Sequence, residues 1–305
     1  MSGAPHRPAP SPPADTVGGA LRALAARLAA AGLDDAPSVA EWALASVLGC
    51  RPLEVYLGAR TPLAPDAAAA LARMADRLVR DEPIQYVTGF TEFCGLRLAT
   101  DRRALIPRPE TEALVTALAE DPGLKAAAAP ALADVGTGSG AIAVALALAL
   151  PRARLLAVDG SADALALARE NARRHGVAER IRFQCADLLG DAPAARLDAI
   201  AANLPYVATA VWAALPARVR EYEPAVALDG GVDGLALIRR LAAQAIGRLR
   251  PGGLLALEIG EDQGAAVRAE LEGHGFADVR VQPDPAGHDR LVLARRPGSA
   301  KVDLA

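Results

Sequence analysis

A glycine-rich loop followed by an acidic residue is the clearest chemical feature of the sequence. Segment 134–141 reads DVGTGSGA and lies between a predicted strand and a predicted helix. Glycines at 136, 138 and 140 allow a sharp turn and let a ligand approach the helix N-terminus. Asp159 ends the next predicted strand, where a carboxylate can accept hydrogen bonds from both hydroxyls of a ribose. The loop therefore indicates a nucleoside cofactor, and both NAD and S-adenosylmethionine fit it.

Three further features favour S-adenosylmethionine. Asp134 precedes the first glycine, where we expect a carboxylate to hold the amino-acid end of the ligand rather than repel a pyrophosphate. Asp187 closes the third predicted strand, and we expect it to meet the adenine amino group. The last two predicted strands, 278–282 and 290–294, are separated only by PDPAGHD, which is too short for a helical crossover. They should pair antiparallel, as in class I methyltransferases and unlike the dinucleotide fold.

A second candidate site, Asn203-Leu204-Pro205-Tyr206, follows the fourth predicted strand. Because parallel strands end at one edge of the sheet, we expect this segment beside the glycine loop. An amide or aromatic amine nitrogen is a poor nucleophile, since its lone pair is delocalised. Acceptors for its N–H groups favour rehybridisation and stabilise the developing positive charge. Asn203 Oδ1 and a backbone carbonyl of the loop suit this role, and Tyr206 can stack on the flat group.

Methyl transfer at such a site is an in-line attack on a sulfonium, in which positioning provides much of the rate. No general base is required before transfer, because the proton becomes acidic once the nitrogen is alkylated. The combination of the two segments predicts a nitrogen methyltransferase.

The elements expected to position these residues alternate between strand and helix from about residue 131. Five strands are predicted at 131–135, 154–158, 180–185, 197–202 and 253–259, and helices at 139–150, 162–175, 235–249 and 263–274. This alternation predicts an α/β fold with a parallel sheet covered on both faces. We assign residues 105–296 to this domain.

Three other regions flank the α/β domain. Residues 17–82 have leucines at helical spacing and predict a small helical domain, which we expect to dock a partner. Its second helix is expected to start at a capping box, Ser38 with Glu41. Residues 83–104 predict a linking β-hairpin. The proline-rich segment 1–16 and residues 297–305 are expected to be tails, the first of them disordered.

Composition excludes several classes of protein. The 33 basic and 36 acidic residues give a net charge of -3, so no overall electrostatic footprint for nucleic acid is expected. The apolar run 141–150 is shorter than the roughly 20 residues needed to cross a bilayer. The 3 cysteines lack metal-ligand spacing, so no metal site is expected. The N-terminus lacks a secretory signal, and we expect a cytoplasmic protein.

The chain resembles the peptide chain release factor N5-glutamine methyltransferases, the PrmC or HemK family. The matching segments, in the family's order, are PIQYVTG, LIPRPETE, DVGTGSGAIA, VDGSADAL, NLPY, EYEPAVAL with DGGVDGL, LRPGGLLALEIG and PDPAGHDR. They extend from about residue 83 to 294, and the helical N-terminal region fits the family in size and position.

The resemblance implies a Rossmann-like class I methyltransferase sheet and an S-adenosylmethionine-dependent enzyme. Such an enzyme methylates the side-chain amide nitrogen (N5) of the glutamine in the Gly-Gly-Gln motif of class 1 translation release factors. The release factor is the implied protein partner, and neither a membrane nor direct nucleic-acid binding is expected.

Carried over by motif, the family's site residues fall in two groups. The cofactor would be held by Gly136, Thr137, Gly138, Ser139, Gly140, Asp159, Asp187, Leu188 and Asn203. The substrate amide would be bound by Asn203, Leu204, Pro205 and Tyr206, with Asn203, Pro205 and Tyr206 as catalytic residues.

Two residues depart from the family's pattern. Leu188 stands where the family usually has tryptophan, so adenine packing is expected to be looser or made through backbone. Leu204 replaces the first proline of Asn-Pro-Pro-Tyr. A backbone carbonyl at that position is still supplied by leucine, and only the rigidity of the loop is affected.

Four alternatives remain at this stage. A glutamine methyltransferase acting on a ribosomal protein shares the chemistry, and only the resemblance of PRPETE favours the release-factor branch. An rRNA adenine dimethyltransferase shares Asn-Leu-Pro-Tyr, but neither LIPRPETE nor the acidic balance suits an RNA substrate. A non-catalytic adaptor would have a degraded glycine loop or Asn203, and an NAD-dependent oxidoreductase would bind NAD tightly.

Overall fold

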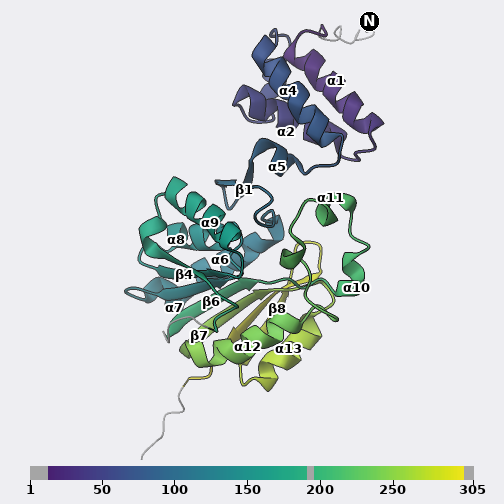
Figure 1. Ribbon diagram of the computed structural model, residues 1–305. Helices are drawn as coiled ribbons and strands as arrows, with labels where there is room; N and C mark the ends of the chain where they lie inside the picture. Colours follow the sequence, from purple (N-terminus) through teal and green to yellow (C-terminus); the bar gives the residue numbers. More distant parts are fainter. Residues whose placement is uncertain (1–12, 191–195, 299–305) are drawn as a thin grey trace, which may run out of the picture. The chain divides into compact units, whose positions relative to one another are not determined.

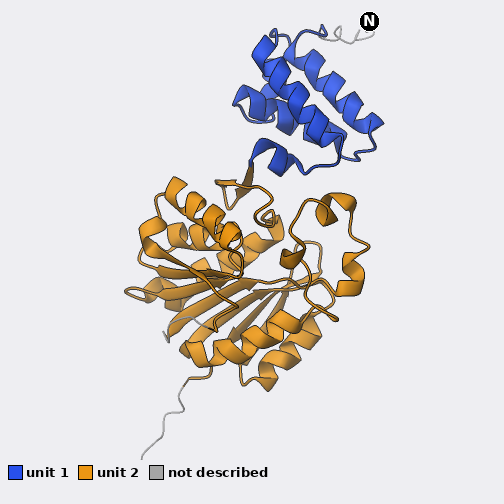
Figure 2. Cartoon of the chain, in the orientation of Figure 1, with its two compact units in different colours: residues 1–89 blue, residues 90–305 orange. Residues whose placement is uncertain are grey.

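The computed structural model describes residues 13–190 and 196–298. The chain divides into two compact units, residues 1–89 and residues 90–305 (Figure 2). Most of the predicted tails, 1–16 and 297–305, lie outside the described residues. Thr16 is described: its hydroxyl accepts a hydrogen bond from Gly19 N at 3.2 Å, and it forms a β-bridge with Pro62. The end of the predicted N-terminal tail therefore belongs to unit 1.

Unit 1 is a helical unit built on stripes of leucine and alanine. Its helices are α1 (Val17–Ala30), α2 (Ala36–Leu48), α3 (Glu54–Leu57), α4 (Pro65–Leu78) and α5 (Ile84–Thr88). Leu28, Leu44 and Leu78 come from three of these helices and are fully buried in one core. The helical spacing of apolar residues predicts such packing.

The start of α2 differs from the sequence prediction. Ser38 lies inside the helix, which begins at Ala36, and the predicted capping box is therefore wrong. Pro37 occupies the first turn, where its fixed φ suits a helix and its missing N–H has no intrahelical partner to lose. The helix consequently starts before the serine.

The hairpin at the start of unit 2 is shorter than predicted. It consists of β1 (Phe90–Phe93) and β2 (Leu96–Ala99), paired antiparallel. Residues 84–88, expected in the hairpin, form α5 instead. That helix ends at Gly89, which has a φ of 79°, a conformation open to glycine at no steric cost.

A seven-stranded mixed sheet forms the centre of unit 2. Its strands are β3 (Ala131–Val135), β4 (Arg154–Asp159), β5 (Ile181–Cys185), β6 (Leu197–Asn203), β7 (Leu249–Glu258), β8 (Ala277–Pro283) and β9 (Asp289–Arg295). The order is β5-β4-β3-β6-β7-β9-β8. Strands β3 to β7 pair parallel, whereas β9 pairs antiparallel with both β7 and β8. The predicted strands and the antiparallel last pair are confirmed.

Helices cover both faces of this sheet (Figure 1). One face carries α6 (Glu112–Glu120), α7 (Pro122–Ala126), α8 (Ala141–Ala149) and α9 (Ala162–Arg174), and the other carries α12 (Ala236–Arg248) and α13 (Gly264–Gly273). Each face has its own apolar core. Every helix in the described ranges is too short or too polar to cross a lipid bilayer.

Short irregular elements complete unit 2. They are η1 (Pro109–Thr111), η2 (Ala178–Arg180), α10 (Thr209–Trp212), α11 (Ala217–Arg220) and η3 (Ala225–Ala227). Strands β3, β4 and β5 are added toward one edge of the sheet and β6 and β7 toward the other, so β3 and β6 are parallel neighbours although two strands separate them in sequence. Such a switch point opens a crevice at the carboxyl ends of the two strands.

Candidate active site

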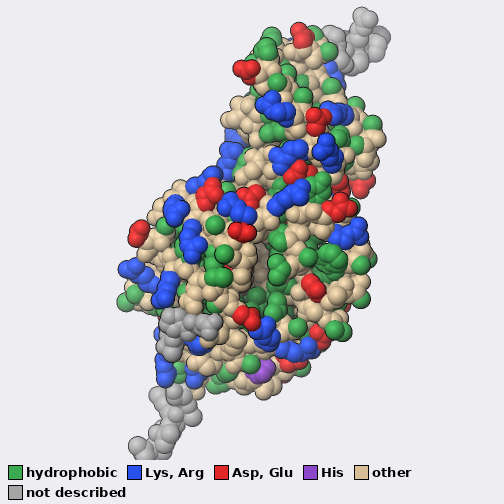
Figure 3. All heavy atoms as spheres, in the orientation of Figure 1, with side chains coloured by type: hydrophobic (Ala, Val, Ile, Leu, Met, Phe, Trp, Pro, Cys, Tyr) green, Lys and Arg blue, Asp and Glu red, His purple; other side chains and the backbone are tan. Residues whose placement is uncertain are grey.

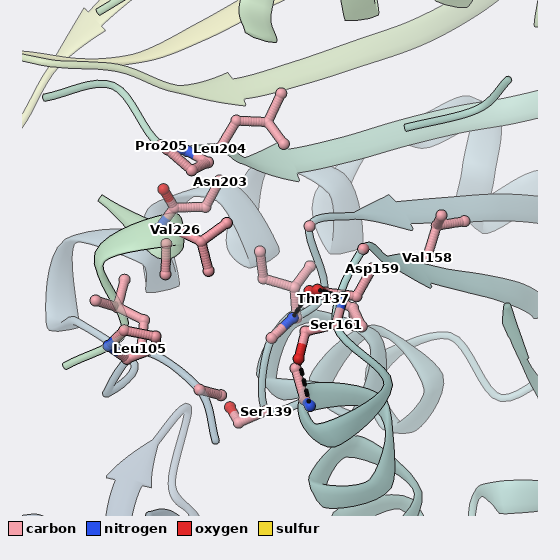
Figure 4. Close-up of a pocket in the computed structure, with 18 of the residues that line it drawn as sticks. Leu105, Thr137, Ser139, Val158, Asp159, Ser161, Asn203, Leu204, Pro205 and Val226 are labelled. Carbon is pink, nitrogen blue, oxygen red and sulfur yellow. Dashed lines mark hydrogen bonds between the residues drawn. The ribbon is translucent and has the colours of Figure 1, made fainter. Parts of the chain in front are cut away.

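A cavity of about 440 Å³ lies at this switch point, within the range typical of small-molecule sites. Figure 3 shows a hollow in this face of unit 2, with hydrophobic side chains beside it. The glycine loop after β3 and the segment after β6 both line the cavity (Figure 4). The predicted site residues that line it are Gly136, Thr137, Gly138, Ser139, Asp159, Asp187, Leu188, Asn203, Leu204 and Pro205.

The glycine loop is held tightly against its neighbours. Gly136 has a φ of 74°, and a Cβ there would lie 2.9 Å from Leu204 Cδ2, so the loop and the 203–206 segment pack together. Gly140 does not line the cavity, although it was predicted to bind the cofactor. A Cβ at Gly140 would lie 2.9 Å from Ala168 Cβ, so this glycine permits close packing of the loop on α9.

Asp134 is hydrogen-bonded to the glycine loop and to the first turn of α8. Its Oδ2 accepts hydrogen bonds from Thr137 Oγ1 at 2.6 Å and from Ala143 N at 3.0 Å. The side chain is fully buried, and its Oδ1 has no hydrogen-bond partner among the described residues. Burial raises the pKa of this carboxyl to about 7, against the two hydrogen bonds that lower it. Asp134 is absent from the residues that line the cavity, so contact between its carboxylate and the ligand stays a prediction.

Asp159 joins the glycine loop to α9 at the cavity wall. Its Oδ2 accepts from Gly138 N and its Oδ1 accepts from Ser161 N, both at 2.8 Å. Ser161 Oγ in turn caps α9 by accepting from Ala164 N at 3.2 Å (Figure 4). An ionised carboxylate has about four acceptor positions. Asp159 is therefore held in place by two bonds and retains the capacity to accept two ribose hydroxyls.

The segment after β5 forms another part of the cavity wall. Asp187 forms an ion pair with Arg240 of α12, and both side chains are well exposed. Leu188 is buried with a φ of 52°, which is uncommon for a residue other than glycine. Gln244 of α12 holds the next backbone amide, since its Oε1 accepts from Leu189 N at 2.8 Å. The sequence analysis did not predict the contacts of Arg240 and Gln244 in α12 with residues 187–189.

Asn203 ends β6 at the cavity and belongs to a buried chain of hydrogen bonds. Its Nδ2 donates to Thr111 Oγ1 at 3.0 Å, and the Thr111 hydroxyl donates to Glu258 Oε2 at 2.6 Å. Thr111 and Glu258 are buried. Desolvation raises the pKa of Glu258, whereas hydrogen bonds from Thr111 and Tyr206 lower it. Neither Thr111 nor Glu258 was predicted as a site residue.

Tyr206 lies apart from the cavity lining. Its hydroxyl donates to Glu258 Oε1 at 3.2 Å, and its carbonyl accepts from Gln263 Nε2 at 2.9 Å. Burial, followed by the charge of Glu258, raises the pKa of the phenol. In this arrangement Tyr206 anchors the segment through both its side chain and its backbone.

An ion pair connects segment 105–112 to the loop between β6 and α12. Arg108, which lines the cavity, pairs with the buried Glu223. The other oxygen of Glu223 accepts from Ile106 N at 3.1 Å. The segment 105–112 is thereby tied to the loop between β6 and α12. Glu112 serves the hairpin instead, since its Oε1 accepts from Cys94 N at 2.7 Å.

Comparison with known proteins identifies two domain families along the chain. Residues 19–89 match the PrmC N-terminal domain, and residues 109–215 match the methyltransferase small domain. The release factor glutamine methyltransferase of Cereibacter sphaeroides is 43% identical over 281 residues, which is 92% of this chain and 98% of that protein. Those of Moorella thermoacetica and Geobacter sulfurreducens are 44% and 41% identical, covering 88% of this chain and 95% and 92% of those proteins.

A solved structure with the same fold is the hMettl16 catalytic domain in complex with MAT2A 3′UTR hairpin 6. It aligns with a TM-score of 0.54 at 17% sequence identity, covering 77% of this chain and 83% of that chain. At this identity the likeness concerns the fold alone. It agrees with the sheet order and the antiparallel last pair described above.

Proposed function

Because this chain belongs to the release factor glutamine methyltransferases, a family that uses S-adenosylmethionine, we propose that its substrate is the glutamine of the Gly-Gly-Gln motif in class 1 release factors. The methyl group is transferred to the side-chain amide nitrogen, N5. The observation that carries this proposal is the position of Asn203. Its amide stands at the cavity wall, across from the glycine loop and Asp159.

The residues at the cavity fit S-adenosylmethionine. Gly136 and Gly138 line the cavity with φ of 74° and 53°, backbone conformations that glycine adopts without steric cost. Asp159 has acceptor capacity for the ribose hydroxyls, and Asp187 with Leu188 lines the part assigned to adenine. When bound, the cofactor supplies an electrophilic methyl group on a sulfonium. The protein's task is then to orient the nucleophile and exclude water.

The substrate amide is bound by neutral acceptors. Asn203 Oδ1 and the carbonyl of Leu204 accept hydrogen bonds from the two N–H groups of the glutamine amide. Those bonds strengthen as positive charge develops on the nitrogen, so they stabilise the transition state more than the ground state. Pro205 shapes the loop that presents the carbonyl, and Tyr206 anchors it through Glu258. The proton leaves after transfer without a dedicated base.

The release factor is the partner that this mechanism requires. The test is an incubation of the full chain with labelled S-adenosylmethionine and a purified class 1 release factor, followed by peptide mapping in a mass spectrometer. We expect one methyl group, on the glutamine of the Gly-Gly-Gln motif. A release factor with alanine at that glutamine is the matched control and should take up no label. Label on ribosomal protein or RNA, with none on the motif, would overturn the substrate assignment while leaving the methyltransferase.

A further inference from the structure

We propose that Glu258 and Thr111 are positioning residues that fix which end of the Asn203 amide faces the substrate. This inference rests on the proposed role of Asn203 as an acceptor for the glutamine amide. An asparagine amide has an oxygen at one end and an NH₂ group at the other, and a rotation of about 180° exchanges them. Only the orientation with Oδ1 toward the cavity accepts a hydrogen bond from the substrate.

The strand register brings the three residues together. Asn203 of β6 lies opposite Glu258 of β7 in the parallel ladder. Thr111, at the end of η1, joins the two side chains. The three residues are far apart in sequence, and Thr111 and Glu258 are separated by 147 positions.

The orientation of the Asn203 amide follows from the number of hydrogen-bond donors and acceptors among Asn203, Thr111, Tyr206 and Glu258. In its ionised form Glu258 can only accept hydrogen bonds, and both of its oxygens have a donor, one in Thr111 and one in Tyr206. The Thr111 hydroxyl has one proton, which it donates to Glu258 at 2.6 Å. Thr111 Oγ1 can therefore act only as an acceptor toward Asn203. The atom of Asn203 that faces it must be the NH₂ group, and Oδ1 is directed elsewhere.

Burial makes it costly to break the hydrogen bonds that join Asn203, Thr111 and Glu258. Thr111 is 4% exposed and Glu258 is 3% exposed, and Thr111 lies between the cavity and Glu258, so burial limits the access of water to the Glu258 carboxylate. A buried donor or acceptor left unpaired is costly. The Glu258 carboxylate accepts the hydrogen bond of the Thr111 hydroxyl, and the hydroxyl oxygen then favours the Asn203 orientation in which Nδ2 faces it. A glutamine at 258 reverses this preference, because its NH₂ can donate to Thr111 and free the hydroxyl proton for Asn203 Oδ1.

The test measures turnover of release factor by variants of the full chain. Removal of one oriented hydrogen-bond group from an active site lowers kcat by about 10²–10³-fold. We expect a fall of about 100-fold in kcat for Glu258→Gln and for Thr111→Val, which keeps the shape of threonine and removes the hydroxyl. Thr111→Ser keeps the hydroxyl and should stay within about threefold of the wild type. Thermal unfolding and S-adenosylmethionine binding by calorimetry should change little in all three.

A double-mutant cycle separates positioning from a general structural role. If Glu258 acts through Asn203, Glu258→Gln should have little further effect on kcat in an Asn203→Ala background. A 100-fold fall in both backgrounds would overturn the proposal, as would equal losses in Thr111→Ser and Thr111→Val. Where the turnover of the doubly substituted enzyme is too low to measure, the serine and valine pair decides.

The proposed function and the positioning proposal can be refuted by different results. If no methyl group reaches the Gly-Gly-Gln glutamine, the substrate assignment is wrong, and if Asn203→Ala is fully active, the role of Asn203 is wrong; both results are independent of the Glu258→Gln result. If Asn203→Ala is impaired and Glu258→Gln is not, only the positioning proposal is refuted.

Discussion

Replacing Asp134 by asparagine should change how the stability of unit 2 depends on pH. The carboxyl is fully buried, and burial raises its pKa from 3.8 to about 7. Between these pH values the native state keeps a proton that the unfolded chain has released. The contribution of Asp134 to stability is therefore fully present below about pH 4, and it is lost as the pH rises through about 7. Above about pH 8 it no longer changes.

The expected magnitude follows from the shift in pKa. Each unit corresponds to about 1.4 kcal/mol of differential stability. The asparagine of the variant has no titrating proton, and its amide oxygen can accept from Thr137 and Ala143 as the Asp134 Oδ2 does. From about pH 5 to about pH 7 the free energy of unfolding of Asp134→Asn should therefore rise relative to the wild type by about 2 kcal/mol.

Urea unfolding at several pH values measures this difference. Trp42 lies in α2 of unit 1 and Trp212 in α10 of unit 2, and the sequence has 2 tryptophans. A Trp42→Phe background therefore makes the fluorescence a probe of unit 2 alone. The same substitution in wild-type and Asp134→Asn chains provides the matched control. A difference in unfolding free energy that stays constant from about pH 5 to about pH 8 would refute the reasoning.

Three more predictions concern the cavity. Asn203→Ala should keep S-adenosylmethionine binding by calorimetry and lower turnover by about 100-fold, since one lost acceptor costs about 3 kcal/mol in the transition state; undiminished turnover would contradict the mechanism. Gly136→Ala should weaken cofactor binding about tenfold, because a left-handed backbone costs a residue with a Cβ about 1–2 kcal/mol and the new Cβ meets Leu204. Adding Leu204→Ala should recover part of that affinity, and no recovery in the calorimeter would mean that the contact is unimportant. Asp159→Ala should raise the Kd for S-adenosylmethionine at least about tenfold through the lost ribose contacts and the released Gly138 amide, and an unchanged Kd would remove Asp159 from the site.

Local sequence patterns predicted the sheet well, because its strands are apolar runs bounded by turn residues. The glycine loop and the 203–206 segment were placed at one edge by topology alone, which the register of β3 beside β6 confirms. The start of α2 was missed because Ser38 looked like a cap while Pro37 decided the boundary. Short-range patterns could not decide between strand and helix for residues 84–88, which have β-branched and aromatic side chains in a single helical turn.

The supporting groups of the site could not be predicted in the same way. Thr111 and Glu258 belong to segments that the sequence analysis noticed, but their contact depends on the alignment of two strands and a 3₁₀ turn. Asp134 was placed at the cavity because of its position before the glycines. The alternation of side chains along β3 buries it under the glycine loop, where its Oδ2 accepts from Thr137 and Ala143.

Leucine at position 204 has a physical explanation in the packing of the two loops. A proline would restrict the backbone of the 203–206 segment by its ring. Leu204 is buried, and its Cδ2 fills the space in front of Gly136. The segment is thus fixed by side-chain packing on the glycine loop, by the Tyr206 hydroxyl on Glu258 and by Gln263 on the Tyr206 carbonyl. Leu204 packs on the loop that we propose binds the cofactor, and its carbonyl is proposed to bind the substrate amide, so we expect this residue to link the two proposed sites more directly than a proline with its shorter side chain.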